Sequence, residues 1–273
     1  MTFPRFLLLI LIAALALPWL SLEVVRATTP IAAAFEERTD ARRYVLRTPN
    51  FRYWAPTDIG RTRSVSLPMF GLAGPQTTRL YHSLGPTSGP ERPAIVLLHG
   101  AGRSGRAMLD MWRGLAEKED LVLLAPDAAR SRGWSLAEDG VFVAEALIED
   151  ASRHHPIDPE RIYLVGHSMG GKMALRLANL GYGPWRAVEA HAASLWVNTI
   201  LPARSPVPIQ IHVGERDTIF SPDAARATGK RLSEAGHDVK FTVIPGHTHW
   251  YYAIAPHLAP VIWQTFTEAE APV

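Results

Sequence analysis

The chain of 273 residues is 47% hydrophobic and 20% charged, the balance of a globular protein that could form one large α/β domain or two small ones. Its 28 Lys and Arg residues nearly balance 26 Asp and Glu, and no basic cluster with interleaved aromatic residues occurs, so nucleic acid is not an expected partner. The absence of cysteine excludes disulfides, a cysteine nucleophile, a thiolate metal site and a lipoprotein anchor.

Residues 1–27 have the layout of a secretory signal peptide. Arg5 supplies a positive charge, residues 6–20 are almost entirely apolar, and residues 25–27 read Val-Arg-Ala, which matches a small-x-small cleavage site. The apolar run of about 15 residues is short for a membrane span, which takes about 20. We therefore predict an exported protein, periplasmic or secreted. An uncleaved inner-membrane anchor is the alternative, and it would be the protein's one contact with a membrane.

The next segment, residues 28–62, mixes charged, proline and aromatic residues without a sustained period. It is predicted to be an irregular N-terminal extension. From residue 63 the pattern changes, and residues 64–67 and 78–81 alternate polar and apolar side chains as short, half-buried strands do. The main folded domain is therefore predicted to span residues 63–268.

Buried strands then alternate with amphipathic helices. Continuous apolar runs such as residues 94–98 are typical of strands covered on both faces, and residues 140–152 carry apolar side chains on one helical stripe. This alternation predicts an α/β fold with a mostly parallel central sheet and helices on both faces. The predicted strands are residues 94–98, 121–125, 161–165, 185–190, 208–213 and 239–244. The predicted helices are residues 107–117, 140–152, 171–180, 222–235 and 259–266.

The most informative motif, Gly166-His-Ser168-Met-Gly170, connects the predicted strand 161–165 to the helix that follows it. Strand, Gly-x-Ser-x-Gly and helix in this order form the nucleophile elbow. The turn is so sharp that a side chain at either glycine would collide with neighbouring backbone. The turn lifts the Ser168 hydroxyl above the sheet edge at a helix N-terminus, where partial positive charge favours a developing oxyanion. Ser168 is therefore the predicted nucleophile.

A serine nucleophile needs a base within hydrogen-bond reach, and the base needs an acid that orients it. In the fold predicted here, acid and base follow the serine along the chain and lie just past strand ends. Asp217 lies in the turn beyond the strand 208–213 and is the predicted acid. Glu215 in the same loop is the alternative, and Asp217 could instead serve as a helix cap or a turn residue.

Two histidines follow the last strand, and the sequence leaves both open as the base. His249 lies farther past the strand end at Ile244, which gives its loop the length to fold back over Ser168, so we favour it over His247. His247 could instead brace the loop through a backbone hydrogen bond. A metal site built from both histidines and Asp217 is the competing interpretation, but it would leave the Gly-x-Ser-x-Gly motif unexplained.

The negatively charged oxygen of an acyl-transfer intermediate needs two backbone N–H donors. One oxyanion donor is expected from Met169, directly after the nucleophile, and the other from the glycine-rich loop of residues 99–105. The Ala101 N–H is the predicted second donor, because the glycines around it let the backbone approach a substrate closely. His99 and His167 are expected to be structural. Trp134 is expected either to line the substrate cleft or to pack in the interior.

These motifs resemble the α/β-hydrolase superfamily over roughly residues 64–268. Two stretches are similar to the esterase group that contains feruloyl esterases, acetyl-xylan-type esterases and polyhydroxybutyrate depolymerases. They are Leu97-Leu-His-Gly-Ala-Gly-Arg-Ser-Gly105 and the segment of residues 139–163, which ends in Ile-Asp-Pro-Glu-Arg-Ile-Tyr. The resemblance implies an α/β-hydrolase fold. The sequence departs from this group at the elbow, where Gly-His-Ser-Met-Gly is the generic hydrolase form, and it lacks the group's cysteines.

About fifteen residues separate the strand 185–190 from Pro208, which is too few for a large cap domain. The predicted function is a serine esterase (a carboxylic ester hydrolase) that acts through an acyl-enzyme on short-chain or polymer-borne esters. Its substrate would be a small molecule or an ester group on a polysaccharide or polyester, and it would need no cofactor and no metal. A serine peptidase or amidase uses the same residues and remains open, as does a non-catalytic envelope binding module on a hydrolase fold.

Overall fold

The computed structural model describes residues 32–40, 58–68 and 76–268, all of which belong to one compact unit, Ile31–Val273. The predicted signal peptide or anchor, residues 1–27, lies outside the described residues. Within them, no helix combines the length and the apolar character needed to cross a membrane.

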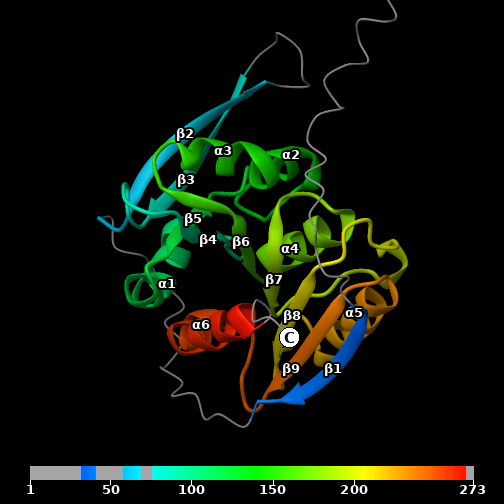
Figure 1. The fold of residues 1–273 in the computed structure, drawn as a ribbon. Helices are drawn as coiled ribbons and strands as arrows, with labels where there is room; N and C mark the ends of the chain where they lie inside the picture. Colours follow the sequence, from blue (N-terminus) through cyan, green and yellow to red (C-terminus); the bar gives the residue numbers. More distant parts are fainter. Residues whose placement is uncertain (1–31, 41–57, 69–75, 269–273) are drawn as a thin grey trace, which may run out of the picture. The chain divides into compact units, whose positions relative to one another are not determined.

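The strands of the described residues form one sheet (Figure 1). They are β1 Ala34–Thr39, β2 Arg61–Pro68, β3 Gln76–Leu84, β4 Arg92–Leu98, β5 Val122–Pro126, β6 Ile157–His167, β7 Trp185–His191, β8 Pro208–Gly214 and β9 Asp238–Ile244. Their order across the sheet is β1-β9-β8-β7-β6-β4-β5-β3-β2. Neighbouring strands are parallel except at the β2–β3 and β3–β5 pairs, which confirms the predicted mostly parallel sheet.

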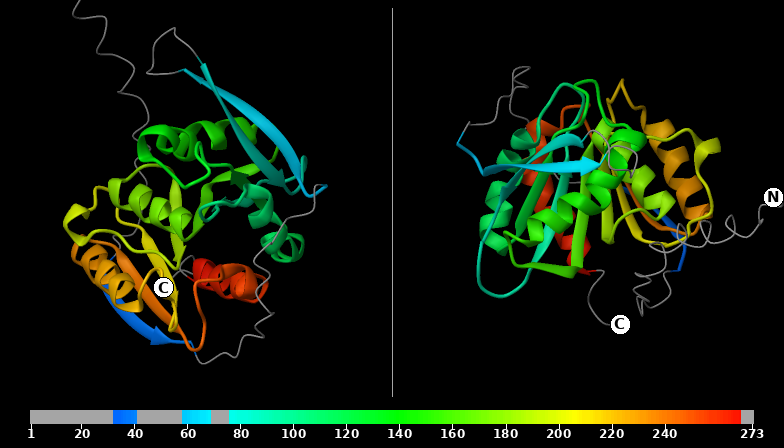
Figure 2. Two further views of the ribbon diagram at one scale, coloured as in Figure 1. Left: turned by 180° about the vertical axis from the view of Figure 1, so that it is seen from behind. Right: turned by 90° about the horizontal axis from the view of Figure 1, so that it is seen from above.

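Helices cover both faces of this sheet, as predicted (Figure 2). They are α1 Gly105–Glu119, α2 Leu136–Val141, α3 Leu147–Ser152, α4 Met169–Leu180, α5 Pro222–Glu234 and α6 Tyr251–Glu268, and one π-helical turn, Phe142–Ala146, joins α2 to α3. Helices α1 and α6 share one hydrophobic core with one face of the sheet. The segment α2–α3, together with α4 and α5, shares a second core with the other face.

Strand β4 illustrates why the sequence forms this layered core. Every side chain from Ala94 to Leu98 is buried, because alternate residues contact opposite helical layers. Full burial of one large aliphatic side chain stabilises the fold by roughly 1.5–3 kcal/mol. The continuous apolar run therefore reflects a strand with no face in water, and it places the loop of residues 99–105 at the carboxyl edge of the sheet.

The structure differs from the predicted irregular extension over residues 28–62. Strand β1 pairs in parallel with β9 at the edge of the sheet, and β2 begins at Arg61. Most of β1 is exposed, and its half-buried Phe35 stacks on Phe241 with ring centroids 6.1 Å apart. A polar edge strand with one apolar anchor has no clear periodicity, which explains why the sequence pattern did not indicate it.

Helix α6 begins well before the predicted helix of residues 259–266. Pro256 and Pro260 lie inside it, and each lacks a backbone N–H that a helix interior would use. The N-terminal half of α6 nevertheless buries Tyr251, Ile254 and Leu258 completely. Burial of these side chains outweighs the local cost of the prolines. As the fold prediction expected, no large cap interrupts the α/β order: residues 192–207, between β7 and β8, contain one 3-10 turn.

Candidate active site

Ser168 lies at the turn between β6 and α4, where the backbone is strained. Its φ of 56° and ψ of −118° fall in a region that residues other than glycine rarely adopt. A side chain at Gly166 would overlap the backbone of Gly170, and a side chain at Gly170 would overlap the backbone of Leu98. The two glycines therefore permit the sharp turn at the end of β6, as the elbow motif predicts.

Ser168, His249 and Asp217 form a hydrogen-bonded chain. The Ser168 Oγ lies 2.9 Å from His249 Nε2, and His249 Nδ1 lies 2.8 Å from Asp217 Oδ2. With this pairing, the hydroxyl donates to the ring and the ring donates to the carboxylate. The three residues follow β6, β8 and β9, so they meet where the carboxyl ends of parallel strands converge. The structure thus brings the sequence-predicted nucleophile, acid and base within hydrogen-bond distance of one another.

Asp217 is buried, and its surroundings stabilise the ionised carboxylate. Its Oδ1 accepts hydrogen bonds from the N–H groups of Ile219 and Phe220, at 2.8 and 2.9 Å. Burial by itself raises the pKa of this carboxyl, but the hydrogen bonds from His249 and from the two amides bring the pKa below its ordinary value. Glu215, the alternative acid, instead accepts a hydrogen bond from the Gly246 N–H at 2.8 Å.

His247, the alternative base, bonds to a different partner. Its Nε2 lies 3.0 Å from Nε2 of His191, so it braces the loop through its side chain and not only through its backbone. The ring is 1% exposed, and this burial is the main cause that lowers the pKa of His247 to about 4, against the raising effect of Asp217. His247 is therefore neutral near pH 7. Within the described residues, no group of three His, Asp or Glu side chains has the arrangement of a metal site.

Stability is expected to fall in mild acid because of His247. Its pKa is about 4 in the folded protein and about 6.5 in an unfolded chain, so the unfolded state binds the proton more tightly. The contribution of the neutral ring is complete above about pH 6.5 and is lost as the pH falls toward 4. Between pH 7.5 and pH 5 we expect a loss of about 2 kcal/mol from this group. Urea unfolding of wild type and His247→Gln at both pH values measures this loss. An equal pH dependence of the free energy of unfolding in the two proteins would contradict the assignment to His247.

The loop of residues 99–105 lies directly against Ser168. A side chain at Gly100 would come within 3.0 Å of the His167 ring and 3.4 Å of Ser168 Cβ. Glycine at this position therefore allows the close approach that the sequence predicts. His167 itself is buried beneath the elbow, in agreement with its expected structural role.

Two backbone N–H groups remain candidates for oxyanion donors. The amides of Gly102 and Arg103 already donate to backbone carbonyls, at 2.7 and 3.2 Å. In the described part of the chain, no hydrogen bond uses the N–H of Ala101, the predicted donor from this loop. Met169, the other predicted donor, opens α4, and the first N–H groups of a helix have no partner within it.

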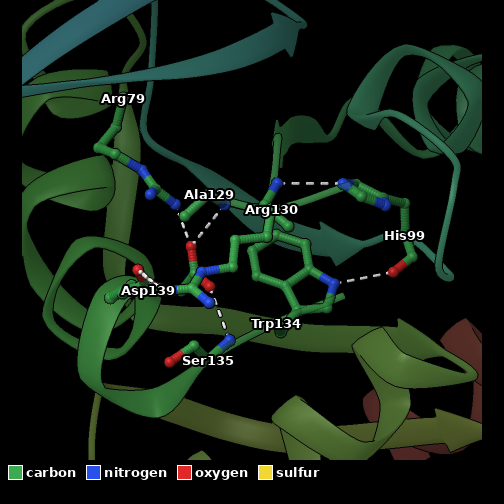
Figure 3. Close-up of polar contacts among 9 residues, drawn as sticks. Arg79, His99, Ala129, Arg130, Trp134, Ser135 and Asp139 are labelled. Atoms are coloured by element: carbon green, nitrogen blue, oxygen red, sulfur yellow. Dashed lines mark hydrogen bonds and ion pairs between the residues drawn. The ribbon is translucent and has the colours of Figure 1, made fainter. Parts of the chain in front are cut away.

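A second loop, residues 127–135, holds the glycine-rich loop in place (Figure 3). The His99 ring accepts from the Ala128 N–H at 3.1 Å and donates from Nδ1 to the Gly100 carbonyl at 2.8 Å. Burial lowers the pKa of His99, and this pair of contacts requires the neutral ring. Trp134 donates from Nε1 to the His99 carbonyl at 2.8 Å and packs its half-buried ring against the imidazole. His99 is thus structural, as expected, and Trp134 braces it.

Asp139 in α2 anchors this second loop from below (Figure 3). Its fully buried carboxylate accepts from the N–H groups of Ala129 and Ser135, at 2.9 and 2.8 Å, and pairs with the buried guanidinium of Arg79 in β3. The Arg79 guanidinium also lies over the Phe142 ring, 5.2 Å from its centroid. Both ends of the loop are therefore tied to one carboxylate in the protein interior.

Asp139→Asn is expected to lower the free energy of unfolding by about 3–5 kcal/mol, because it leaves the Arg79 cation buried without its counter-ion. Urea unfolding at pH 7 measures the change. The neighbouring Glu138→Gln is a matched control, since Glu138 pairs with Arg130 at 2.7 Å on the surface. An exposed pair of this kind contributes little to stability, because solvent screens it. Equal destabilisation by the two substitutions would mean that the buried pair has no special role.

Several aromatic groups around the site were not found from the sequence. The Phe220 ring stacks on the His249 ring with centroids 5.9 Å apart. Arg103, in the glycine-rich loop, lies over the rings of Trp250 and Tyr252, with its guanidinium carbon 5.4 and 5.2 Å from their centroids. Each of these residues lies within a few positions of a predicted site residue, and this proximity in sequence could have indicated them. Nothing in the sequence pattern indicated that their side chains meet.

The profile of the dienelactone hydrolase family matches residues 110–260, more than half of the chain. The protein named "Putative esterase NocK" from Nocardia uniformis subsp. tsuyamanensis is 28% identical over 207 residues, which cover 70% of this chain and 56% of that relative. The chain thus spans little more than half of that relative's length.

Solved structures of esterases share the fold. Esterase PE8 has 21% identity and a TM-score of 0.57, with 67% of this chain and 97% of that one covered. A CE1 ferulic acid esterase from Anaeromyces mucronatus has 16% identity and a TM-score of 0.59, with 83% and 96% covered. Similarity at this level of identity supports the fold alone, and it agrees with the predicted α/β-hydrolase architecture.

The family match includes Ser168, Asp217 and His249, whereas the three N-terminal strands and β4 lie outside it. The sequence predicted the superfamily correctly, and a feruloyl esterase is among the structural neighbours of the chain. The chain belongs to the dienelactone hydrolase family of the α/β-hydrolase superfamily.

Proposed function

We propose that the protein is a serine carboxylic ester hydrolase in which Ser168 is the nucleophile, His249 the base and Asp217 the orienting acid. The observation that carries this proposal is the pair of hydrogen bonds from Ser168 through His249 to Asp217, 2.9 and 2.8 Å long. A serine hydroxyl is a weak nucleophile by itself, and a histidine that accepts its proton activates it. Membership of a hydrolase family and an esterase relative support ester cleavage as the reaction.

In the first half of this reaction, Ser168 Oγ attacks the ester carbonyl carbon while His249 Nε2 takes the hydroxyl proton. Asp217 keeps the ring in the tautomer that carries its proton on Nδ1 and stabilises the imidazolium that forms. The carbonyl oxygen becomes negatively charged, and the N–H groups of Ala101 and Met169 would donate to it. Loss of one such donor typically costs about 3 kcal/mol of transition-state stabilisation.

The tetrahedral intermediate then collapses to the acyl-enzyme. The bond from carbon to the alcohol oxygen breaks, and His249 gives its proton to the departing alcohol. A water molecule repeats the attack on the acyl carbon with His249 again as base, which releases the acid and restores the Ser168 hydroxyl. In this cycle the proton transfers involve only Ser168, His249, the departing alcohol and water.

The connection from β7 to β8 supports short-chain or polymer-borne esters as substrates. Residues 192–207 contain only a short 3-10 turn, so no inserted cap domain encloses the site at this position. An uncapped site accepts an ester on a bulky polysaccharide or polyester more readily than an enclosed one. Feruloyl and acetyl-sugar esters are therefore suitable candidates beside simple short-chain esters.

The proposal is tested by turnover of the purified full-length chain on nitrophenyl esters from acetate to decanoate, on feruloyl and acetyl-sugar esters, and on matching nitroanilides. We expect ester hydrolysis that falls with acyl length and much slower anilide cleavage. A fluorophosphonate probe should label the protein at Ser168, as located by peptide mass spectrometry.

Anilide cleavage faster than ester cleavage would favour a peptidase or amidase instead. If the protein turned over none of these substrates and was not labelled by the probe, the proposal would be contradicted and a non-catalytic binding module would be favoured.

A further inference from the structure

Three buried histidine rings form a hydrogen-bonded chain beneath the candidate active site. His167 ends β6, His191 ends β7, and His247 lies in the loop between β9 and α6. His191 Nδ1 lies 3.1 Å from His167 Nδ1, and His191 Nε2 lies 3.0 Å from His247 Nε2. The three residues are 2%, 0% and 1% exposed, so water does not compete for these bonds. None of the three rings takes or gives a proton in the proposed reaction.

The bonds constrain the protonation of all three rings. Burial lowers the pKa of each ring, so all three are neutral near pH 7. A neutral imidazole has one N–H and one lone pair, so His191 must donate at one nitrogen and accept at the other. The backbone of His191 favours a proton on the His167 ring, so we infer that His167 donates in its contact with His191 Nδ1. His191 then accepts from His167 and donates from Nε2 to His247.

One hydrogen bond of the His191 ring leads to the end of β6, next to Ser168, and the other leads to the loop that carries His249. Strand pairing already fixes the first of these segments, but not the second. The backbones of β6 and β7 pair at His167 and His191, and the Ser168 N–H donates to the His191 carbonyl at 2.9 Å. The nucleophile is therefore tied to β7 without any side chain. The loop that carries His249 takes no part in the strand pairing of the described residues. Its backbone is bonded to the loop after β8, where the Arg216 N–H donates to the His247 carbonyl at 2.8 Å, and the His247 ring bonds it to β7.

We propose that His191 is a positioning residue for the proposed ester hydrolysis. Its Nε2–H holds His247, and thereby His249 two residues later, at the correct distance from the Ser168 that its own backbone carbonyl binds. The role rests on the proposed function, because it matters only if Ser168 and His249 react together. His191 does not touch the reacting atoms.

Other titratable groups surround His191 on the same face of the sheet and restrict what can replace it. The Tyr251 ring packs 4.8 Å from the His191 ring, and its hydroxyl accepts a hydrogen bond from Trp112 Nε1 at 2.9 Å. Glu189, two residues earlier in β7, pairs with His212 of β8 at 3.3 Å, and burial raises the pKa of its carboxyl. A substitute at 191 must therefore be uncharged and of similar size.

The chain of bonds allows a test with three substitutions. In His191→Gln, an amide nitrogen reaches the former Nε2 position and can donate to His247. In His191→Asn, the shorter side chain can accept from His167 but does not reach His247. In His191→Phe, both bonds are lost while the volume of the ring is kept. His237→Gln is the matched control, since His237 is also buried but bonds to the backbone of Val207, directly before β8 and away from the carboxyl edge of the sheet.

Kinetics on a short-chain nitrophenyl ester, well below the melting temperature of each variant, should separate the two bonds. We expect kcat to fall about 100-fold in His191→Phe and His191→Asn with KM within about threefold, since small errors in the position of a reacting group have effects of this size. His191→Gln should stay within about fivefold of wild type, and His237→Gln should equal it. Melting temperatures of all variants are measured in parallel.

Wild-type kcat in both His191→Phe and His191→Asn would overturn the positioning role, and so would a His191→Gln variant as slow as His191→Phe. If either His191→Phe or His191→Asn fails to fold, the comparison of His191→Gln with the other of the two decides the question. Absence of ester turnover in wild type would instead refute the proposed function, so the two failures are distinguishable.

Discussion

Ser168→Ala is expected to lower kcat for ester hydrolysis by about 10⁵- to 10⁶-fold, because it removes the oxygen that would form the acyl-enzyme. This factor corresponds to roughly 7–8 kcal/mol of transition-state stabilisation. Substrate binding and the backbone donors remain, so a small residual rate above that of water should persist. Initial rates with a nitrophenyl ester measure the loss, and urea unfolding establishes that the variant is folded.

Two further variants make the Ser168 result specific. Ser152→Ala removes an exposed hydroxyl that donates to the Ile148 carbonyl in α3, and it should leave kcat unchanged. The double variant Ser168→Ala/His249→Gln should be no slower than Ser168→Ala alone, because groups that act as a unit do not lose activity additively. Full turnover by Ser168→Ala would exclude this serine as the nucleophile.

The nucleophile, acid and base could be located from the sequence because each follows a recognisable strand. An apolar run marks β6, and apolar residues that alternate with polar ones mark β8 and β9. Parallel strands end at one edge of the sheet, and Ser168 carries a local motif. Chain order then limits the search to two short loops. Each step uses information within a few residues, and the resulting three side chains do meet in the structure.

The support of the site could not be predicted, because it depends on contacts between distant segments. Arg79 and Asp139 are 60 residues apart. Asp139 begins one of the stretches similar to the esterase group, but nothing in the sequence pairs it with Arg79. His191 is a buried polar residue at the end of β7, and only the register of β6 with β7 brings it beside His167. Hydrophobic periodicity indicates which face of an element is buried, but not which polar groups meet there.

The choice between the two histidines produces the second large expected effect. His249→Gln should lower kcat by about 10⁵-fold or more, since the amide cannot take the Ser168 proton. His247→Gln should remain within about tenfold of wild type, because glutamine can still accept a hydrogen bond from His191. The same substitution at both positions keeps side-chain size comparable. Initial rates at pH 7.5 with one nitrophenyl ester give kcat for both variants.

The reverse result, an inactive His247→Gln and an active His249→Gln, would assign the base to His247. Two features argue against that outcome. The pKa of His247 is about 4, and a base so far below the working pH has little tendency to accept a proton from a serine. Its Nε2 also faces His191 at 3.0 Å, whereas His249 Nε2 faces Ser168 Oγ at 2.9 Å. The base must combine a free lone pair with a path to the hydroxyl, and His249 meets both conditions.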